Sequence, residues 1–271
     1  LSSYFIGKKG AIAMMRLEHI TAGYEGVAKV FDVSARFEKG ALTVLVGPNG
    51  CGKSTLVKAA AGLLRPMAGQ VFLKGELLKR PSPKLLAREV SFMPQARSAP
   101  GITVGQLAAH GRYPHLGLGR TLTKGDMAQV EAALVKTHTL ELANRPVNQL
   151  SGGERQRAYL AMLLAQDTDL IFLDEPTTFL DMKSQFELMD LCLSLKAAGK
   201  TLVLVLHDLQ LALHYADRLI VLERGRAICH GTPKAVFDAG HLQAVFGIDI
   251  REVERGQYLF TREPLNKSRT R

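Results

Sequence analysis

The 271-residue chain has no tryptophan and only three cysteines, Cys51, Cys192 and Cys229. These cysteines show neither a paired metal-ligand spacing nor the density of a disulfide scaffold, which excludes a small secreted fold and favours a reducing compartment. Long hydrophobic runs are also missing: stretches such as TLVLVL at 201–206 fall far short of the roughly 20 residues of a membrane-spanning helix. With 46% hydrophobic and 22% charged residues, the composition is instead typical of a folded globular chain.

Charge is strongly biased, with a formal net charge of +10. An excess of this size suits a nucleic-acid partner or a position against an anionic membrane face. No nucleic-acid-binding module is recognisable, and the basic residues are dispersed except in the tail NKSRTR at 266–271, so we expect no nucleic-acid partner. Residues 1–13 contain no convincing signal peptide and are expected to be an upstream extension of a domain that begins near Met14.

Short apolar segments that recur along the chain predict an α/β fold. Segments 16–24, 30–37, 41–47, 89–93, 169–175, 201–207 and 218–225 have the composition of strands, and helical stretches separate several of them. This alternation indicates a mainly parallel sheet with crossover helices. No clear strand occurs between residues 96 and 149, where 103–112 and 126–142 carry helical spacing, so a mostly helical insert is expected there.

The stretch GPNGCGKST at 47–55 fits the phosphate-loop pattern and lies between a predicted buried strand and a helix that begins near Lys53. Glycines let backbone N–H groups surround phosphate oxygens, Lys53 reaches the β- and γ-phosphates, and Ser54 is placed to ligate Mg²⁺. A helix N-terminus can lower the pKa of Cys51, although we favour the alternative that it is a tolerated small residue. The expected nucleotide-binding residues of this loop are Gly47, Pro48, Asn49, Gly50, Cys51, Gly52, Lys53, Ser54 and Thr55.

Polar residues end two of the apolar strands. Asp174 and Glu175 close the segment LIFLDE, at the edge where open parallel sheets hold ligands. We expect Asp174 to hold the metal and Glu175 to polarise an attacking water. His207 ends TLVLVLH and is expected to contact the γ-phosphate and position that water. Together with Lys53, Glu175 and His207 are the predicted catalytic residues.

In the order GPNGCGKST, LSGGERQR, LIFLDE and LVLVLHD, these motifs resemble the nucleotide-binding subunit of ABC transporters, over about residues 15–246. The resemblance implies an ATPase head: a P-loop NTPase core with an N-terminal antiparallel β subdomain and a helical subdomain at about 96–165. It also implies that two copies pack head to tail as an ATP-driven homodimer. Each Mg-ATP would then lie between the phosphate loop of one copy and Ser151, Gly152 and Gly153 of the other.

The same resemblance implies roles for three further residues. Tyr24 matches the aromatic residue that stacks on adenine, although an isolated tyrosine in a strand is more often a core residue. Gln95 matches the glutamine that senses Mg²⁺ and faces the membrane partner. Asp181 matches the aspartate at the dimer interface, and it is equally well placed to be the N-cap of the next helix.

The insert segment ITVGQLAAHGRYPHLG at 102–117, followed by PTTFLD and LHDLQLALHYAD, resembles the ATPases of bacterial iron-siderophore importers. Relatives of these ATPases serve haem and cobalamin import. The resemblance implies a peripheral subunit at the cytoplasmic face of the inner membrane. Its partners would be polytopic permease subunits and, through them, a periplasmic or lipoprotein substrate-binding protein.

Three other functions are alternatives to transport. A DNA-repair or chromosome-structure ATPase usually splits this head with a coiled coil or a zinc insert, and neither pattern occurs in the sequence. A soluble ATPase of iron-sulfur assembly remains an open alternative, whereas a binding module without hydrolysis is disfavoured by the presence of both Glu175 and His207.

Residues 247–271 are expected to form a strand pair that completes the fold, followed by a tail.

Overall fold

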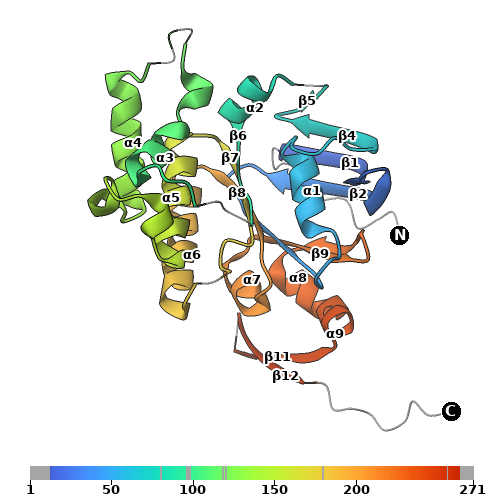
Figure 1. Cartoon of the computed structure of the whole chain (residues 1–271). Coiled ribbons are helices and arrows are strands. Elements are labelled where there is room, and N and C mark those ends of the chain that lie inside the picture. The colour runs from blue at the N-terminus through green and yellow to red at the C-terminus, as the bar shows by residue number, and fades with distance from the viewer. Residues whose placement is uncertain are drawn as a thin grey trace, which may run out of the picture.

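A computed structural model describes residues 13–79, 81–95, 99–117, 119, 121–178, 180–254 and 256–262. Figure 1 shows a central sheet with the antiparallel strands and α1 on one side and a cluster of helices on the other. None of the helices in these ranges is long and apolar enough to cross a membrane. Ala13 begins the first strand, and the rest of the predicted upstream extension lies outside the described residues.

The central sheet has six strands in the order β10-β9-β3-β8-β7-β6. All neighbouring pairs are parallel except β10 and β9, so the predicted mainly parallel sheet is confirmed. Every residue of β3, β7 and β8 is buried, as expected for strands covered on both faces. The strands are β3 Leu42–Val46, β6 Val90–Met93, β7 Leu170–Asp174, β8 Thr201–Val205, β9 Arg218–Glu223 and β10 Arg226–Gly231.

A second, antiparallel sheet has the order β2-β1-β4-β5. Its strands are β1 Ala13–Tyr24, β2 Val27–Glu38, β4 Ala68–Leu73 and β5 Glu76–Leu77. The apolar side chains of β1 and β2 share one core with α1 (Lys53–Ala60) and the central sheet. Within that core the rings of Phe37 and Phe172 meet edge to face, with centroids 5.8 Å apart. Figure 1 shows α1 between this antiparallel sheet and the central sheet.

The predicted helical insert is confirmed between β6 and β7. It contains α3 Val104–His110, η2 Tyr113–His115, α4 Lys124–Lys136, η3 Leu140–Leu142, η4 Val147–Gln149 and α5 Gly152–Ala165, and α2 Pro83–Glu89 precedes it. The longer insert helices begin where the sequence supplies capping boxes, in which a hydroxyl side chain and the third helical residue satisfy each other's backbone N–H groups. These N-caps are Thr103, Thr123 and Ser151.

The remaining helices are α6 Met182–Ala197, α7 Leu209–Tyr215, α8 Pro233–Asp238 and α9 His241–Phe246. The strand pair predicted after residue 246 is present as β11 Ile248–Glu254 and β12 Gln257–Arg262. Its Ile250 and Tyr258 are buried in the main core, and the ring of Tyr258 lies 5.0 Å from that of Phe237 in α8. The pair therefore packs onto the main domain.

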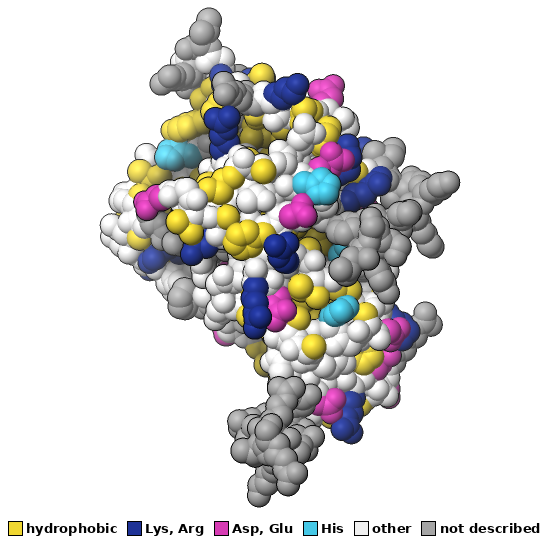
Figure 2. Space-filling model, turned by 90° about the vertical axis from the view of Figure 1, so that its right-hand side faces the viewer, with side chains coloured by type: hydrophobic (Ala, Val, Ile, Leu, Met, Phe, Trp, Pro, Cys, Tyr) yellow, Lys and Arg dark blue, Asp and Glu magenta, His cyan; other side chains and the backbone are white. Residues whose placement is uncertain are grey.

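Figure 2 views the molecule from the right-hand side of Figure 1. On this face lysine and arginine side chains are scattered among aspartates and glutamates. The positive charge is thus not gathered into one basic patch on the face shown, which agrees with the dispersed pattern in the sequence.

Candidate functional site

The phosphate loop joins β3 to α1, and two of its glycines are required by close backbone approaches. A Cβ on Gly47 would lie 2.2 Å from the carbonyl oxygen of Leu222, and one on Gly52 would lie 2.9 Å from that of Lys29. Gly52 also has φ of 103°, which favours glycine. The loop is therefore fixed between strand β2 and the end of strand β9.

Lys53, the first residue of α1, is almost fully buried at 4% exposure. Its ammonium donates to the carbonyl oxygens of Gly47 at 2.8 Å and Pro48 at 3.0 Å. These contacts hold a cation over the loop, where the helix N-terminus adds positive potential. The arrangement suits a ligand with several phosphate oxygens.

Ser54 and Asp174 lie side by side although they are 120 residues apart, with Ser54 Oγ donating to Asp174 Oδ1 at 2.9 Å. Burial raises the pKa of Asp174, while the Ser54 hydrogen bond opposes that shift. A hydroxyl and a carboxylate are hard oxygen ligands, and Mg²⁺ is usually held by one or two such groups together with substrate phosphates. The Ser54 hydroxyl and the Asp174 carboxylate therefore fit Mg²⁺ by the chemistry of their oxygen atoms.

Glu175 follows β7 directly and is buried to 8% exposure. One oxygen lies 2.5 Å from His207 Nε2, and the other accepts a hydrogen bond from Gln95 Nε2. Gln95 thus contacts the predicted catalytic carboxylate, whereas the sequence reasoning had associated it with the Mg²⁺ ligands. The three side chains come from the carboxyl ends of neighbouring parallel strands, β6, β7 and β8.

Of these groups, Lys53, Ser54, Gln95, Glu175 and His207 line one cavity of about 530 Å³, whereas Asp174 lies behind Ser54 and is not among its lining residues. Tyr24, which is 43% exposed, forms part of the wall and is not packed in the core, and its stacking on adenine stays a prediction. Lys29 also lines the cavity and was missed, because no motif in the sequence includes it. The full lining is Tyr24, Lys29, Asn49, Gly50, Gly52, Lys53, Ser54, Thr55, Gln95, Glu175 and His207.

The residues of the motif LSGGERQR do not line this cavity. Ser151 is the N-cap of α5: its hydroxyl accepts from Glu154 N–H at 3.3 Å, and its own N–H donates to the Glu154 carboxylate at 2.8 Å. Ser151 and Gly152 are exposed, and Gly153 is partly exposed. The start of this 14-residue helix is therefore exposed and does not contribute to the cavity of its own chain.

Comparison with known proteins identifies the family. The profile of the ABC transporter family matches residues 30–178. The chain belongs to the ABC transporter family. It is 45% identical over 236 residues to the achromobactin transport ATP-binding protein CbrD of Dickeya dadantii (strain 3937), covering 86% of this chain and 88% of the relative. It is 40% identical over 240 residues to the ferric enterobactin transport ATP-binding protein FepC of Escherichia coli (strain K12), covering 88% and 89%.

A solved structure shares the fold. It is a dimeric ATP-binding cassette in a post-hydrolysis state bound to ADP and Pi, with a TM-score of 0.72 and 25% identity, covering 81% of this chain and 99% of that one. As an ABC transporter ATP-binding subunit, the chain is a nucleotide-binding ATPase.

Asp181 of the ABC subunit is the N-cap of α6, where its carboxylate accepts from Ser184 N–H at 2.7 Å. This hydrogen bond lowers the pKa of Asp181. The interpretation of Asp181 as a helix cap is therefore confirmed, and its role at a dimer interface stays a prediction.

Cys51 has a different environment from the one its position at a helix start suggested. Its side chain is buried to 5% exposure, and burial raises the pKa of the thiol despite the nearby Lys53 ammonium. The less favoured alternative, a lowered pKa, does not hold because desolvation outweighs the positive end of α1 and the adjacent charge. Cys51 is thus a packed small residue, which is the alternative that the sequence reasoning favoured.

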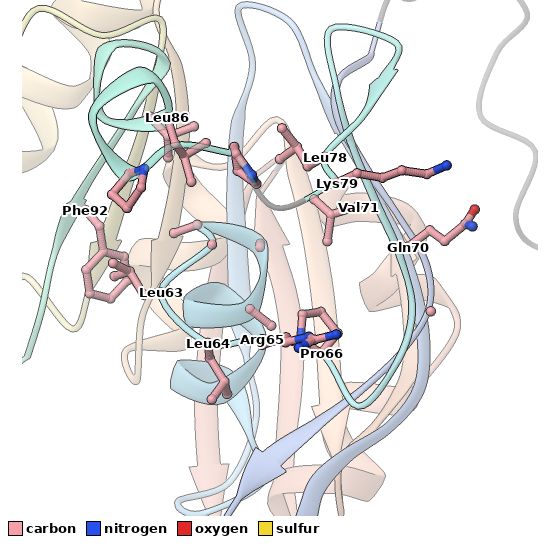
Figure 3. Close-up of a pocket in the computed structure, with 18 of the residues that line it drawn as sticks. Leu63, Leu64, Arg65, Pro66, Gln70, Val71, Leu78, Lys79, Leu86 and Phe92 are labelled. Atoms are coloured by element: carbon pink, nitrogen blue, oxygen red, sulfur yellow. The ribbon is translucent and has the colours of Figure 1, made fainter.

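A second and larger hollow, of about 980 Å³, lies beside the end of α1. Its lining is largely apolar and comes from elements that are distant in the sequence, with Leu63 after α1, Val71 in β4, Leu86 in α2 and Phe92 in β6 (Figure 3). Leu63 is 62% exposed, so the hollow presents apolar surface to the outside. Figure 3 also shows Gln70 and Lys79 directed away from it.

Proposed function

We propose that this chain is the ATPase of a bacterial iron-siderophore importer. The observation that carries the ATPase half is the Glu175 carboxylate, which Gln95 and His207 hold at one end of a cavity that also contains a phosphate loop and an exposed tyrosine. The transport half is supported by relatives named for achromobactin and ferric enterobactin transport. These two relatives have similar identity to this chain but are named for different siderophores, which indicates that the partners of this chain choose the cargo.

The roles of the side chains follow from their positions. We assign adenine stacking to Tyr24, charge neutralisation of the phosphate chain to Lys53, and activation of the attacking water to Glu175, with His207 fixing the carboxylate and contacting the γ-phosphate. Ser54 and Asp174 would hold Mg²⁺, which when bound neutralises the charge that develops on the transferred phosphoryl group. Gln95 is assigned to the link between this site and the outside of the molecule.

We further propose that two copies complete each other's sites. Residues 151–153 lie at the exposed N-terminus of α5, which favours anions, yet they do not line the nucleotide cavity of their own chain. In a head-to-tail homodimer, the Ser151 hydroxyl and the backbone N–H groups of Gly152 and Gly153 would contact the γ-phosphate held by the other copy. Asp181 would lie at the same interface.

The apolar hollow beside α1 is assigned to the membrane partner. Its volume of about 980 Å³ and its exposed Leu63 suit a short amphipathic helix of a polytopic permease, inserted between α1, β4 and α2. Phe92 lines the hollow, and Gln95, three residues further along, contacts Glu175. A helix seated there would therefore be mechanically connected to the catalytic carboxylate.

The subunit would then lie at the cytoplasmic face of the cell membrane, and a substrate-binding protein would deliver cargo to the permease from the other side.

Uptake of ferric siderophores labelled with radioactive iron tests this function directly. Bacteria that lack the gene for this chain should lose ATP-dependent uptake of at least one such complex, and a plasmid carrying the wild-type chain should restore it. The Glu175→Gln chain should be expressed to the same level and fail to restore uptake. Unchanged uptake of catecholate, hydroxamate and carboxylate siderophores in the deleted strain would contradict the proposed cargo class.

A further inference from the structure

Lys29 lines the nucleotide cavity and belongs to none of the motifs. It lies in strand β2, two residues from Val27, which pairs with Tyr24, so Lys29 and Tyr24 line the cavity from the antiparallel sheet, whereas Gln95, Glu175 and His207 lie at the carboxyl ends of the central strands. Since Glu175 must face the terminal phosphate, the Tyr24 end of the cavity receives the base and the phosphates nearest to it. Lys29 is therefore placed at the base end of the bound nucleotide.

The backbone of Lys29 is held firmly against the phosphate loop. A Cβ on Gly52 of the loop would approach the Lys29 carbonyl oxygen to 2.9 Å, and a Cβ on Gly225 would approach it to 2.5 Å from the other side. The neighbouring Phe31 N–H donates to the Gly225 carbonyl at 2.8 Å, and Gly225 N–H donates to that of Cys51 at 3.0 Å. These contacts fix where the Lys29 side chain starts, so its reach toward the cavity is limited to its own rotamers.

The ammonium of Lys29 makes no ion pair or side-chain hydrogen bond with any residue in the described part of the chain. Several other lysines do, including Lys74 with Glu89, Lys196 with Asp217 and Lys200 with Asp167. Lys29 is also exposed, so its charge is fully available to a ligand. An unpaired cation beside a phosphate-binding loop attracts phosphate oxygens.

We propose that Lys29 is a nucleotide-binding residue that contacts the α-phosphate end of a nucleoside di- or triphosphate. This inference rests on the proposed nucleotide site and adds a second lysine to it. Lys53 contacts the β- and γ-phosphates, and Lys29 contacts the α-phosphate, which is present in both ATP and ADP. Because that contact is the same before and after hydrolysis, it strengthens substrate and product binding equally and leaves the chemical step unchanged.

The test compares Lys29→Met with the parent chain, since methionine keeps the apolar stem and removes the charge. Dissociation constants for ATP, ADP and adenosine are measured by competition with a fluorescent nucleotide, with Glu175→Gln in both chains to prevent turnover. We expect the constants for ATP and ADP to rise by the same factor, roughly three- to tenfold at low salt, because the contact is charge-assisted but solvent-exposed. The constant for adenosine should not change, and Lys29→Arg should restore tight binding.

Salt separates an ionic contact from a structural effect. The difference between Lys29→Met and its parent should shrink as potassium chloride rises from 0.05 to about 1 M, where the Debye length falls to about 3 Å. Lys124→Met, an exposed lysine at the start of α4, is the matched control and should bind all three ligands as the parent does. Equal ATP binding by Lys29→Met and its parent, or a change for ATP alone, would overturn the assignment of Lys29. Failure of the parent itself to bind ATP would instead overturn the proposed function.

Discussion

Glu175 and His207 meet with 2.5 Å between Oε1 and Nε2, although 32 positions separate them in the sequence. The contact arises because β7 and β8 are parallel neighbours in which Asp174 pairs with Val205, so the residues that follow both strands emerge at one edge of the sheet. Gln95, which follows β6, reaches the same carboxylate. One sheet edge therefore brings Gln95, Glu175 and His207 together from three neighbouring strands.

Replacing Glu175 by glutamine should nearly abolish ATP hydrolysis and leave ATP binding intact. The amide keeps the shape of the side chain but cannot polarise a water, and loss of such a group lowers the rate by about 10²- to 10⁴-fold. Steady-state phosphate release and a nucleotide-binding titration on the same preparation measure the two effects. Turnover near that of the wild type would remove Glu175 from the catalytic role.

The sequence was sufficient to predict the strands that end at this edge. Their apolar runs are continuous, and each run ends abruptly at a polar or charged residue, Asp174 or His207. The sequence was also sufficient to predict that Lys53 and Ser54 lie at the start of a helix beside the cavity, because phosphate binding fixes their spacing in the loop. It did not reveal the Gln95–Glu175 contact or the placement of Lys29, because both depend on how separate elements pack. The burial of Cys51 was likewise hidden, since local position indicates the helix dipole but not desolvation.

Gly225→Ala should weaken nucleotide binding as well as the fold. Its φ is 78°, and a Cβ there would lie 2.5 Å from the Lys29 carbonyl oxygen, which borders the phosphate loop at Gly52, and 2.6 Å from the ring of Phe31. Gly75→Ala is the matched control, because its φ is 88° but no atom lies within 4 Å of the added carbon. Backbone strain should destabilise both variants by about 1–2 kcal/mol.

The clash should cost Gly225→Ala roughly a further 1–3 kcal/mol and raise its dissociation constant for ATP. Urea unfolding and a nucleotide titration distinguish the two variants. If they lose the same stability and both bind ATP normally, the β9–β10 turn does not support the phosphate loop.

The three cysteines should react with a maleimide in an order set by burial. Cys229 is partly exposed and should label first, whereas Cys51 and Cys192 are buried and should label slowly in the folded protein. Burial also raises the pKa of all three thiols, that of Cys192 to about 12, which lowers the reactive thiolate fraction. Mass spectrometry of peptides sampled over time measures the order. Labelling of Cys51 before Cys229 would show that the phosphate loop is open rather than packed.

Asp126 should make folding stability dependent on acid pH. Hydrogen bonds from the Thr123 side chain and backbone, and then from Arg112, lower its pKa from 3.8 to about 2. Because the folded pKa is below the unfolded one, its contribution is present above about pH 4 and is lost as the pH falls toward 2. The stability difference between the wild type and Asp126→Asn should therefore shrink over that range in urea titrations.

Glu131→Gln, an exposed carboxylate change on the same helix α4, is the control and should show no comparable loss. A difference between wild type and Asp126→Asn that stays constant from pH 5 to pH 2 would contradict the role given to the Thr123 and Arg112 hydrogen bonds.

The most direct measurement concerns whether Ser151 completes the site of a second copy. A Lys53→Ala pair has two damaged sites, and so has a Ser151→Arg pair, but a mixed pair places both lesions in one site and leaves the other whole. The two variants, each also carrying Glu175→Gln, are labelled with different fluorophores, and energy transfer is recorded with and without Mg-ATP. We predict an ATP-dependent signal in the mixture and none when either variant is paired with itself. Equal signals in all three samples, or none in the mixture while the Glu175→Gln parent dimerises, would contradict the shared site.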